Sequence, residues 1–101
     1  MLAKLDELGI AKNTLLIAIN DNGGTVGIDT WNAGMRGAKG NAYYGSVRAY
    51  SFWRWPGTLT PAVRGQLTAH HDVLPTLAAI AGANLSSELQ GKLDGYDLTS
   101  L

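Results

Sequence analysis

The chain contains 101 residues, of which 46% are hydrophobic and 16% are charged, a composition typical of a folded globular protein and not of a disordered one. Eight basic side chains balance eight acidic ones, so the net charge gives no reason to expect a nucleic acid or an anionic membrane as a partner. Cysteine is absent, which excludes disulfides and thiolate metal sites within these residues.

The first 14 residues, MLAKLDELGIAKNT, predict a short amphipathic helix. Leu2, Leu5 and Leu8 recur at every third position with charged residues between them, and Gly9 stands where a left-handed residue commonly ends a helix. The stretch contains no long apolar segment. We therefore expect neither a signal peptide nor a membrane span here, and no membrane partner.

Residues 13–20, NTLLIAIN, form a nearly continuous apolar run that is followed by Asp21, Asn22 and two glycines. Such a run predicts a strand covered on both faces, as in a parallel sheet of the α/β class. Because Asp, Asn and Gly are common turn residues, the DNGG segment could simply reverse the chain. It could also hold a hard cation, because its carboxylate and amide oxygens follow a buried strand. These residues alone leave both interpretations open.

Residues 21–48 predict a long loop, because they contain seven glycines and no sustained helical or strand periodicity. Connections of this length are usually functional or disordered, and aromatic residues such as Trp31 and Tyr43 argue against disorder. The aromatic segment AYSFWRW at 49–55 then predicts a strand, and Pro-Gly at 56–57 predicts a turn after it.

The segment HDVLPTLAAIAGA, residues 71–83, predicts a helix capped by Asp72. Pro75 is tolerated in its first turn, and Gly82 stands near its end. From Asn84 the chain becomes polar, with no repeat, low-complexity segment or second domain.

Three basic residues of the long loop, Arg36, Lys39 and Arg48, lie among glycines and not on a helix face. They could form a solvated basic loop, but clustered cations with free backbone N–H groups also make a site for an oxyanion. Together with DNGG they suggest a site in which a metal ion and a lysine share the charge of a tetrahedral ester.

Four segments in order, NTLLIAINDNGG, NAGMRGAKGNAYYGSVRAYSFWRWPG, HHDVLPTLAAIAGA and LDGYDL, resemble the carboxyl-terminal part of the catalytic domain of type I sulfatases. The resemblance implies an α/β fold of the alkaline phosphatase-like superfamily, of which this chain would form a partial mixed sheet flanked by helices. It also implies a calcium-dependent hydrolase of sulfate esters. Residues 1–101 would be a fragment of that catalytic domain, without its nucleophile-bearing amino-terminal part.

The same resemblance assigns roles to individual residues. Asp21 and Asn22 match the family's calcium-ligating Asp-Asn pair, which favours the metal interpretation of DNGG. Lys39 matches the lysine that contacts the sulfate group. Arg36 and Arg48 match arginines that accompany this lysine, and a structural role is expected for both.

His70 and Asp72 match a His-x-Asp sequence that precedes the family's Leu-Pro-Thr helix. Asp72 is expected to cap this helix. His70 is a candidate catalytic residue, although a supporting position in the loop is expected for it before a role as proton donor. No role is expected for His71.

Several family features are missing or altered. Tyr44 and Ser46 stand where the family often has glutamate and glycine, which implies different packing of the loop or a different substrate entrance. None of the three prolines lies in the Cys/Ser-x-Pro-x-Arg motif that yields the formylglycine nucleophile. Asp21 and Asn22 offer two or three of the roughly six to eight oxygen ligands that calcium takes. We therefore expect that this chain is inactive alone and needs the remainder of the sulfatase domain.

Two alternatives to a sulfatase remain open. One is a phosphate or phosphonate ester hydrolase of the same superfamily, and the other is a non-catalytic binding module on the same fold. The presence of Asp21, Asn22 and Lys39 favours an enzyme, because a scaffold needs none of them. The resemblance suggests a periplasmic, secreted or lysosomal location, and the residues do not identify the sulfate ester.

Overall fold

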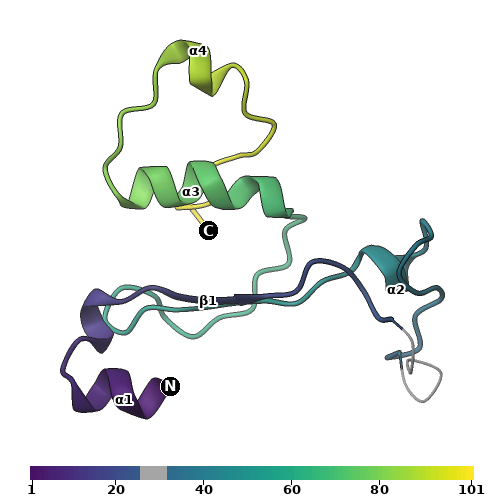
Figure 1. The fold of residues 1–101 in the computed structure, drawn as a ribbon, viewed down its shortest axis with the longest axis horizontal. Helices are drawn as coiled ribbons and strands as arrows, with labels where there is room; N and C mark the ends of the chain where they lie inside the picture. Colours follow the sequence, from purple (N-terminus) through teal and green to yellow (C-terminus); the bar gives the residue numbers. More distant parts are fainter. Residues whose placement is uncertain (26–31) are drawn as a thin grey trace. The chain divides into compact units, whose positions relative to one another are not determined.

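The computed structural model describes residues 1–25 and 32–101, which form two compact units, Met1–Pro61 and Ala62–Leu101 (Figure 1). Of the loop predicted at 21–48, residues 26–31 lie outside the described part, and Gly27 and Trp31 lie there with them. None of the described helices is long and apolar enough to cross a membrane.

The first unit begins with the predicted helix. Helix α1 spans Leu2–Glu7, and Gly9, with a φ of 69°, reverses the backbone after it as expected. A 3-10 helix, η1 (Ala11–Asn13), follows directly. Strand β1 therefore begins later than the apolar run predicted and spans Leu16–Ile19.

Strand β1 pairs with β2 (Ser51–Arg54), and the two strands lie side by side in Figure 1. The pairing is antiparallel, with Ile17 opposite Trp53, so the prediction of a parallel strand is wrong for this pair. The physical reason is that the chain leaves β1 and enters β2 at the same end of the sheet, whereas a parallel pair needs a crossover to the other end. At that end, Tyr50 N donates to Asn20 Oδ1 at 2.6 Å.

The apolar run was expected to be covered on both faces, but in the described structure much of it is not. Ala18 and Ile19 of β1 are exposed, and Phe52 of β2 is 68% exposed. Uncovered apolar side chains of this kind are the physical consequence of a partial sheet, which was expected, because a sheet of two strands leaves edges and hydrophobic surface without partners.

The DNGG segment packs against a short helix, α2 (Tyr44–Val47), which the sequence did not predict. Gly23 N donates to Ser46 O at 2.7 Å, and Gly24 N donates to Gly45 O at 3.2 Å. A Cβ atom on Gly23 would lie 2.0 Å from Gly45 O. Only glycine fits at position 23, because the two backbones approach too closely for any side chain.

The second unit contains η3 (His70–Asp72), α3 (Val73–Ile80) and α4 (Ser87–Gln90). Helix α3 confirms the predicted helix, with Pro75 buried in its first turn and Gly82 at a φ of 66° after its end. Helix α4 was not predicted. Ser86 caps it, because its Oγ accepts a hydrogen bond from Leu89 N at 3.2 Å.

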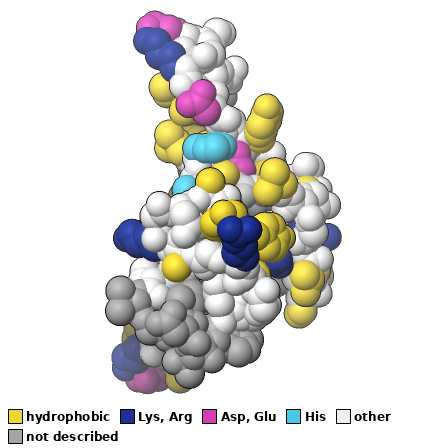
Figure 2. Space-filling model, turned by 90° about the vertical axis from the view of Figure 1, so that its right-hand side faces the viewer, with side chains coloured by type: hydrophobic (Ala, Val, Ile, Leu, Met, Phe, Trp, Pro, Cys, Tyr) yellow, Lys and Arg dark blue, Asp and Glu magenta, His cyan; other side chains and the backbone are white. Residues whose placement is uncertain are grey.

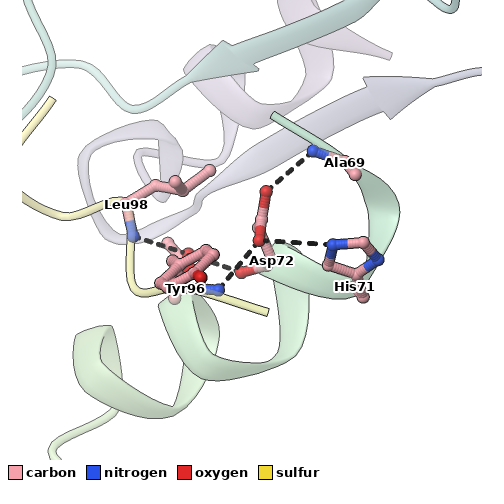
Figure 3. A network of polar contacts seen from close by, with 6 residues as sticks. Ala69, His71, Asp72, Tyr96 and Leu98 are labelled. Atoms are coloured by element: carbon pink, nitrogen blue, oxygen red, sulfur yellow. Dashed lines mark hydrogen bonds and ion pairs between the residues drawn. The ribbon is translucent and has the colours of Figure 1, made fainter. Parts of the chain in front are cut away.

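Asp72 stands at the N-cap position of α3, but its carboxylate accepts no hydrogen bond from that helix, so the predicted capping contact is wrong. The reason is that Asp72 is the last residue of η3 and has helical backbone angles, a φ of −74° and a ψ of −18°, whereas a capping residue normally has an extended backbone. The carboxylate, only 4% exposed, instead accepts from Ala69 N at 2.7 Å and from Tyr96 N at 2.8 Å (Figure 3).

The carboxyl-terminal residues 95–98 pack against the start of α3 and form hydrogen bonds with it. Thr76 Oγ1 lies 2.6 Å from Asp72 O and accepts a hydrogen bond from Leu98 N at 3.0 Å. A Cβ atom on Gly95 would lie 2.0 Å from His71 O. Two segments far apart in the sequence, HHDVLPT and GYDL, thus form one polar contact network.

Two backbone hydrogen bonds hold the pKa of Asp72 below its usual value. The bond from Tyr96 N–H has the larger effect and that from Ala69 N–H the next, and the nearby His71 lowers the pKa further. Burial opposes the shift but does not reverse it. Because the folded-state pKa is depressed, the stabilisation by Asp72 is present above about pH 4 and is lost as the pH falls through the folded value.

We expect Asp72→Ala, made in the full-length protein, to lower the free energy of unfolding by about 2–4 kcal/mol, because two buried N–H groups lose a charged acceptor. Urea unfolding at pH 7 measures this loss. Asp94→Ala, at an exposed carboxylate, is the matched control and should change stability by less than about 0.5 kcal/mol. The difference between the native protein and Asp72→Ala should shrink below about pH 4. Equal stability of the two variants at pH 7 would contradict this role.

Candidate functional site

Asp21 and Asn22 follow β1, where Asn20 fixes the course of the chain. Asn20 donates through Nδ2 to Asn22 O and accepts from Tyr50 N through Oδ1. Asn22 in turn donates through Nδ2 to Gly23 O at 2.6 Å, so its Oδ1 is the atom that could ligate a cation. Asp21 is exposed and Asn22 is half-buried. The segment makes a turn, and the turn presents hard oxygen donors.

Lys39 lies beside the DNGG segment. Its backbone N donates to Gly24 O at 2.7 Å, although 15 positions separate the two residues. The Lys39 side chain is exposed. The structure therefore brings the backbone of Lys39 beside the segment that carries Asp21 and Asn22, so three of the four residues predicted for the site lie on neighbouring segments of the first unit.

Gly45 of α2 is the centre of this arrangement. Its N donates to Arg36 O at 2.8 Å, and its O accepts from Gly24 N. A Cβ atom at this position would lie 2.6 Å from Asn32 Nδ2 and 2.7 Å from Gly37 O. The loop that carries Lys39 can thus pack against α2 only because residue 45 has no side chain.

Arg36 and Arg48 each contact a tyrosine. The Arg36 guanidinium donates to Tyr43 Oη and lies 3.7 Å from the centre of that ring. Arg48 Nη1 donates to Tyr44 Oη at 2.8 Å. These contacts agree with the structural role expected for both arginines, and they give Tyr44, one of the departures from the family pattern, a packing partner.

Ser46, the second departure, is buried and 4% exposed. Its Oγ donates to Asn41 Oδ1 and also lies 2.8 Å from Tyr43 O. The altered residues of this loop therefore make contacts within the loop itself.

His70 lies in the second unit, on η3, and its side chain is exposed. Its neighbour His71, for which no role was expected, has Nε2 at 3.8 Å from Asp72 Oδ1, an ion pair when the imidazole is protonated (Figure 3). Sequence reasoning also missed the docking of Tyr96 and Leu98 on α3. The glycine of the LDGYDL segment was the signal for a close backbone approach there.

A carboxylate and an amide oxygen are donors that suit calcium, so Asp21 and Asn22 fit part of a calcium site. They do not complete one. Among residues 1–25 and 32–101, no group of three or more His, Cys, Asp or Glu side chains could hold a metal ion. The remaining ligands of a calcium ion would have to come from other residues.

Known proteins are similar to this chain over most of its length. The family described as Sulfatase matches residues 1–83. The chain is 42% identical to a sulfatase of Formosa agariphila over 92% of its length, 38% identical to human arylsulfatase A over its whole length, and 39% identical to mouse steryl-sulfatase over its whole length. These matches cover 17%, 20% and 17% of the respective relatives, so the chain spans about a fifth of their length. Since the family match extends over most of its residues, the chain belongs to the sulfatase family.

Proposed function

We propose that this chain is part of a longer sulfatase that hydrolyses sulfate esters, with Asp21 and Asn22 as calcium ligands and Lys39 as the residue that contacts the sulfate group. The formylglycine nucleophile and the other calcium ligands would come from residues outside this chain. In the longer protein, β1 and β2 would belong to a mixed sheet flanked by helices, in the alkaline phosphatase-like fold.

The observation that carries this proposal is the hydrogen bond from Lys39 N to Gly24 O, 2.7 Å long. It fixes the loop that carries the lysine against the segment that carries the Asp-Asn pair. A divalent cation and an ammonium group held close together can bind one doubly or singly charged oxyanion between them. The names of the relatives, which include an arylsulfatase and a steryl-sulfatase, support a sulfate ester over a phosphate ester.

Bound calcium would polarise the sulfate oxygens and stabilise the charge that develops on them. Asp21 supplies an anionic oxygen that binds the ion, and Asn22 supplies a neutral one, its orientation fixed by the bond from Nδ2 to Gly23 O. Lys39, which lies on the other loop, contacts the sulfate with its positively charged ammonium group. The close Gly23 to Gly45 contact keeps these groups in place before the substrate binds.

The family resemblance supports a periplasmic, secreted or lysosomal location, which fractionation of the source cells would test.

His70 is a second candidate for a catalytic residue of the proposed sulfatase. A His70→Ala variant of the full-length protein that retains its kcat would remove this residue from the chemistry.

We expect Lys39→Ala in the full-length protein to lower kcat for an aryl sulfate by about 10²- to 10³-fold, the usual loss when one preorganised oxyanion-stabilising group is removed. Steady-state kinetics measure the effect. Lys12→Ala, at another exposed lysine, is the control and should leave kcat within about twofold. An unchanged kcat in Lys39→Ala would exclude this lysine from the site.

We expect Asp21→Ala to abolish high-affinity calcium binding by the full-length protein, because an oxygen-ligand site tolerates poorly the loss of an anionic ligand. Asp21→Asn, which keeps one ligand oxygen without the charge, should bind calcium with intermediate affinity. Titration calorimetry with calcium distinguishes the three proteins. Native affinity in Asp21→Ala would mean that the DNGG segment serves only as a turn.

A further inference from the structure

We infer that Arg36 and Arg48 form an anion-binding surface beside Lys39, and that the protein prefers sulfate esters carrying a second anionic group, such as another sulfate or a carboxylate. This inference rests on the proposed function, since it concerns the substrate of the same site. It gives the two arginines a role in binding in addition to their local contacts.

The first observation is the distribution of charge along the sequence. Residues 31–61, all in the first unit, contain no Asp or Glu, yet they hold four of the eight basic residues of a chain whose net charge is zero. These four basic residues are Arg36, Lys39, Arg48 and Arg54. An excess of one sign within a neutral protein creates a local field that attracts anions.

The second observation is that three of these cations belong to one backbone network around Gly45. Arg36 O accepts from Gly45 N, while Lys39 N reaches Gly45 through the two hydrogen bonds of Gly24. Arg48 ends α2, the helix that contains Gly45, with its N donating to Tyr44 O at 3.1 Å. The three cationic residues thus lie on segments that are bonded to one another.

The third observation concerns the partners of the arginines. Arg54 forms an ion pair with Asp6 at 3.6 Å, so its charge is matched. Arg36 and Arg48 instead donate to the neutral phenols of Tyr43 and Tyr44, which are neighbours in the sequence. A phenol orients a guanidinium without neutralising it, and each guanidinium has five N–H donors, of which the phenol takes one.

The side chains of this surface are exposed within this chain. Tyr43 is 44% exposed and Tyr44 is 60% exposed, and both arginines are exposed. The Arg36 guanidinium lies 3.7 Å from the ring centre of Tyr43, and that of Arg48 lies 5.2 Å from the ring centre of Tyr44. Figure 2 shows that Lys or Arg side chains lie beside hydrophobic ones on one face of the molecule. Ring contacts of this kind reduce the freedom of an exposed arginine and so lower the entropy lost when it binds an anion.

One sulfate group already has Lys39 and the proposed calcium ion as partners. The two oriented guanidinium groups of the arginines are therefore not needed to bind that sulfate. They suit a planar carboxylate or a second sulfate, which arginine binds through paired hydrogen bonds. A substrate with one anionic group would leave these donors unused. A substrate with two would engage both the lysine and the arginines.

The test compares two esters that differ by one charge, para-nitrophenyl sulfate and the same ester with a carboxylate on the ring, in steady-state kinetics of the full-length protein. We expect kcat/KM to be about tenfold higher for the carboxylated ester, through a lower KM, the scale of one charge-assisted hydrogen bond. In the double variant Arg36→Gln, Arg48→Gln, the ratio of the two kcat/KM values should fall to about one. Arg64→Gln, at an exposed arginine of the second unit, is the control and should keep the native ratio.

The possible results separate the two proposals. A native ratio near one, or a double variant that keeps a tenfold ratio, overturns the anion-binding surface while leaving the sulfatase proposal intact. Absence of turnover of either ester by the calcium-loaded native protein contradicts the proposed function itself. If the double variant does not fold, the native protein still tests the surface, because a preference that depends on exposed charges must decrease as salt rises from about 0.05 to 0.5 M. A preference that salt leaves unchanged would overturn the surface.

Discussion

The close contact between Gly23 and Gly45 is the constraint on which the candidate site depends. Two backbones meet with no room for a Cβ atom at position 23, and the contact is fastened by hydrogen bonds from Gly23 and Gly24 to Ser46 and Gly45. Through it, the turn after β1 and the loop with Lys39 become one structure. Together with the direct hydrogen bond from Lys39 N to Gly24 O, it holds the segment of the Asp-Asn pair and the loop of the lysine next to each other, as joint binding of a metal ion and an oxyanion would require.

The glycines of DNGG therefore have a function that neither the turn nor the metal interpretation of the sequence includes. The structure shows a turn whose glycines allow a second backbone to approach. Such a contact could not be predicted, because it depends on α2, a helix of four residues that is too short to leave a periodic pattern in the sequence. The docking of Gly95 on His71 was missed for a similar reason, since a close approach of two backbones leaves no periodic pattern either.

Longer elements were predicted well, because their signals are local. The spacing of leucines and the glycine after them were sufficient for α1, and the apolar segment between Asp72 and Gly82 was sufficient for α3. The direction of strand β1 was not predicted correctly. The side chains of an apolar strand do not indicate which strand it pairs with, and β1 is antiparallel to β2. The capping contact of Asp72 was predicted wrongly because η3, a turn of three residues that leaves no periodic pattern, gives Asp72 a helical backbone.

The roles proposed for Asp21, Asn22 and Lys39 rest on the family resemblance, and the structure adds the proximity of the segments that carry them. A crystal structure of the full-length protein with calcium and sulfate bound would test these roles most directly. We predict calcium at about 2.3–2.6 Å from oxygens of Asp21 and Asn22, and Lys39 Nζ within about 3 Å of a sulfate oxygen. Calcium bound elsewhere, or Lys39 directed away from the sulfate, would contradict the proposed site.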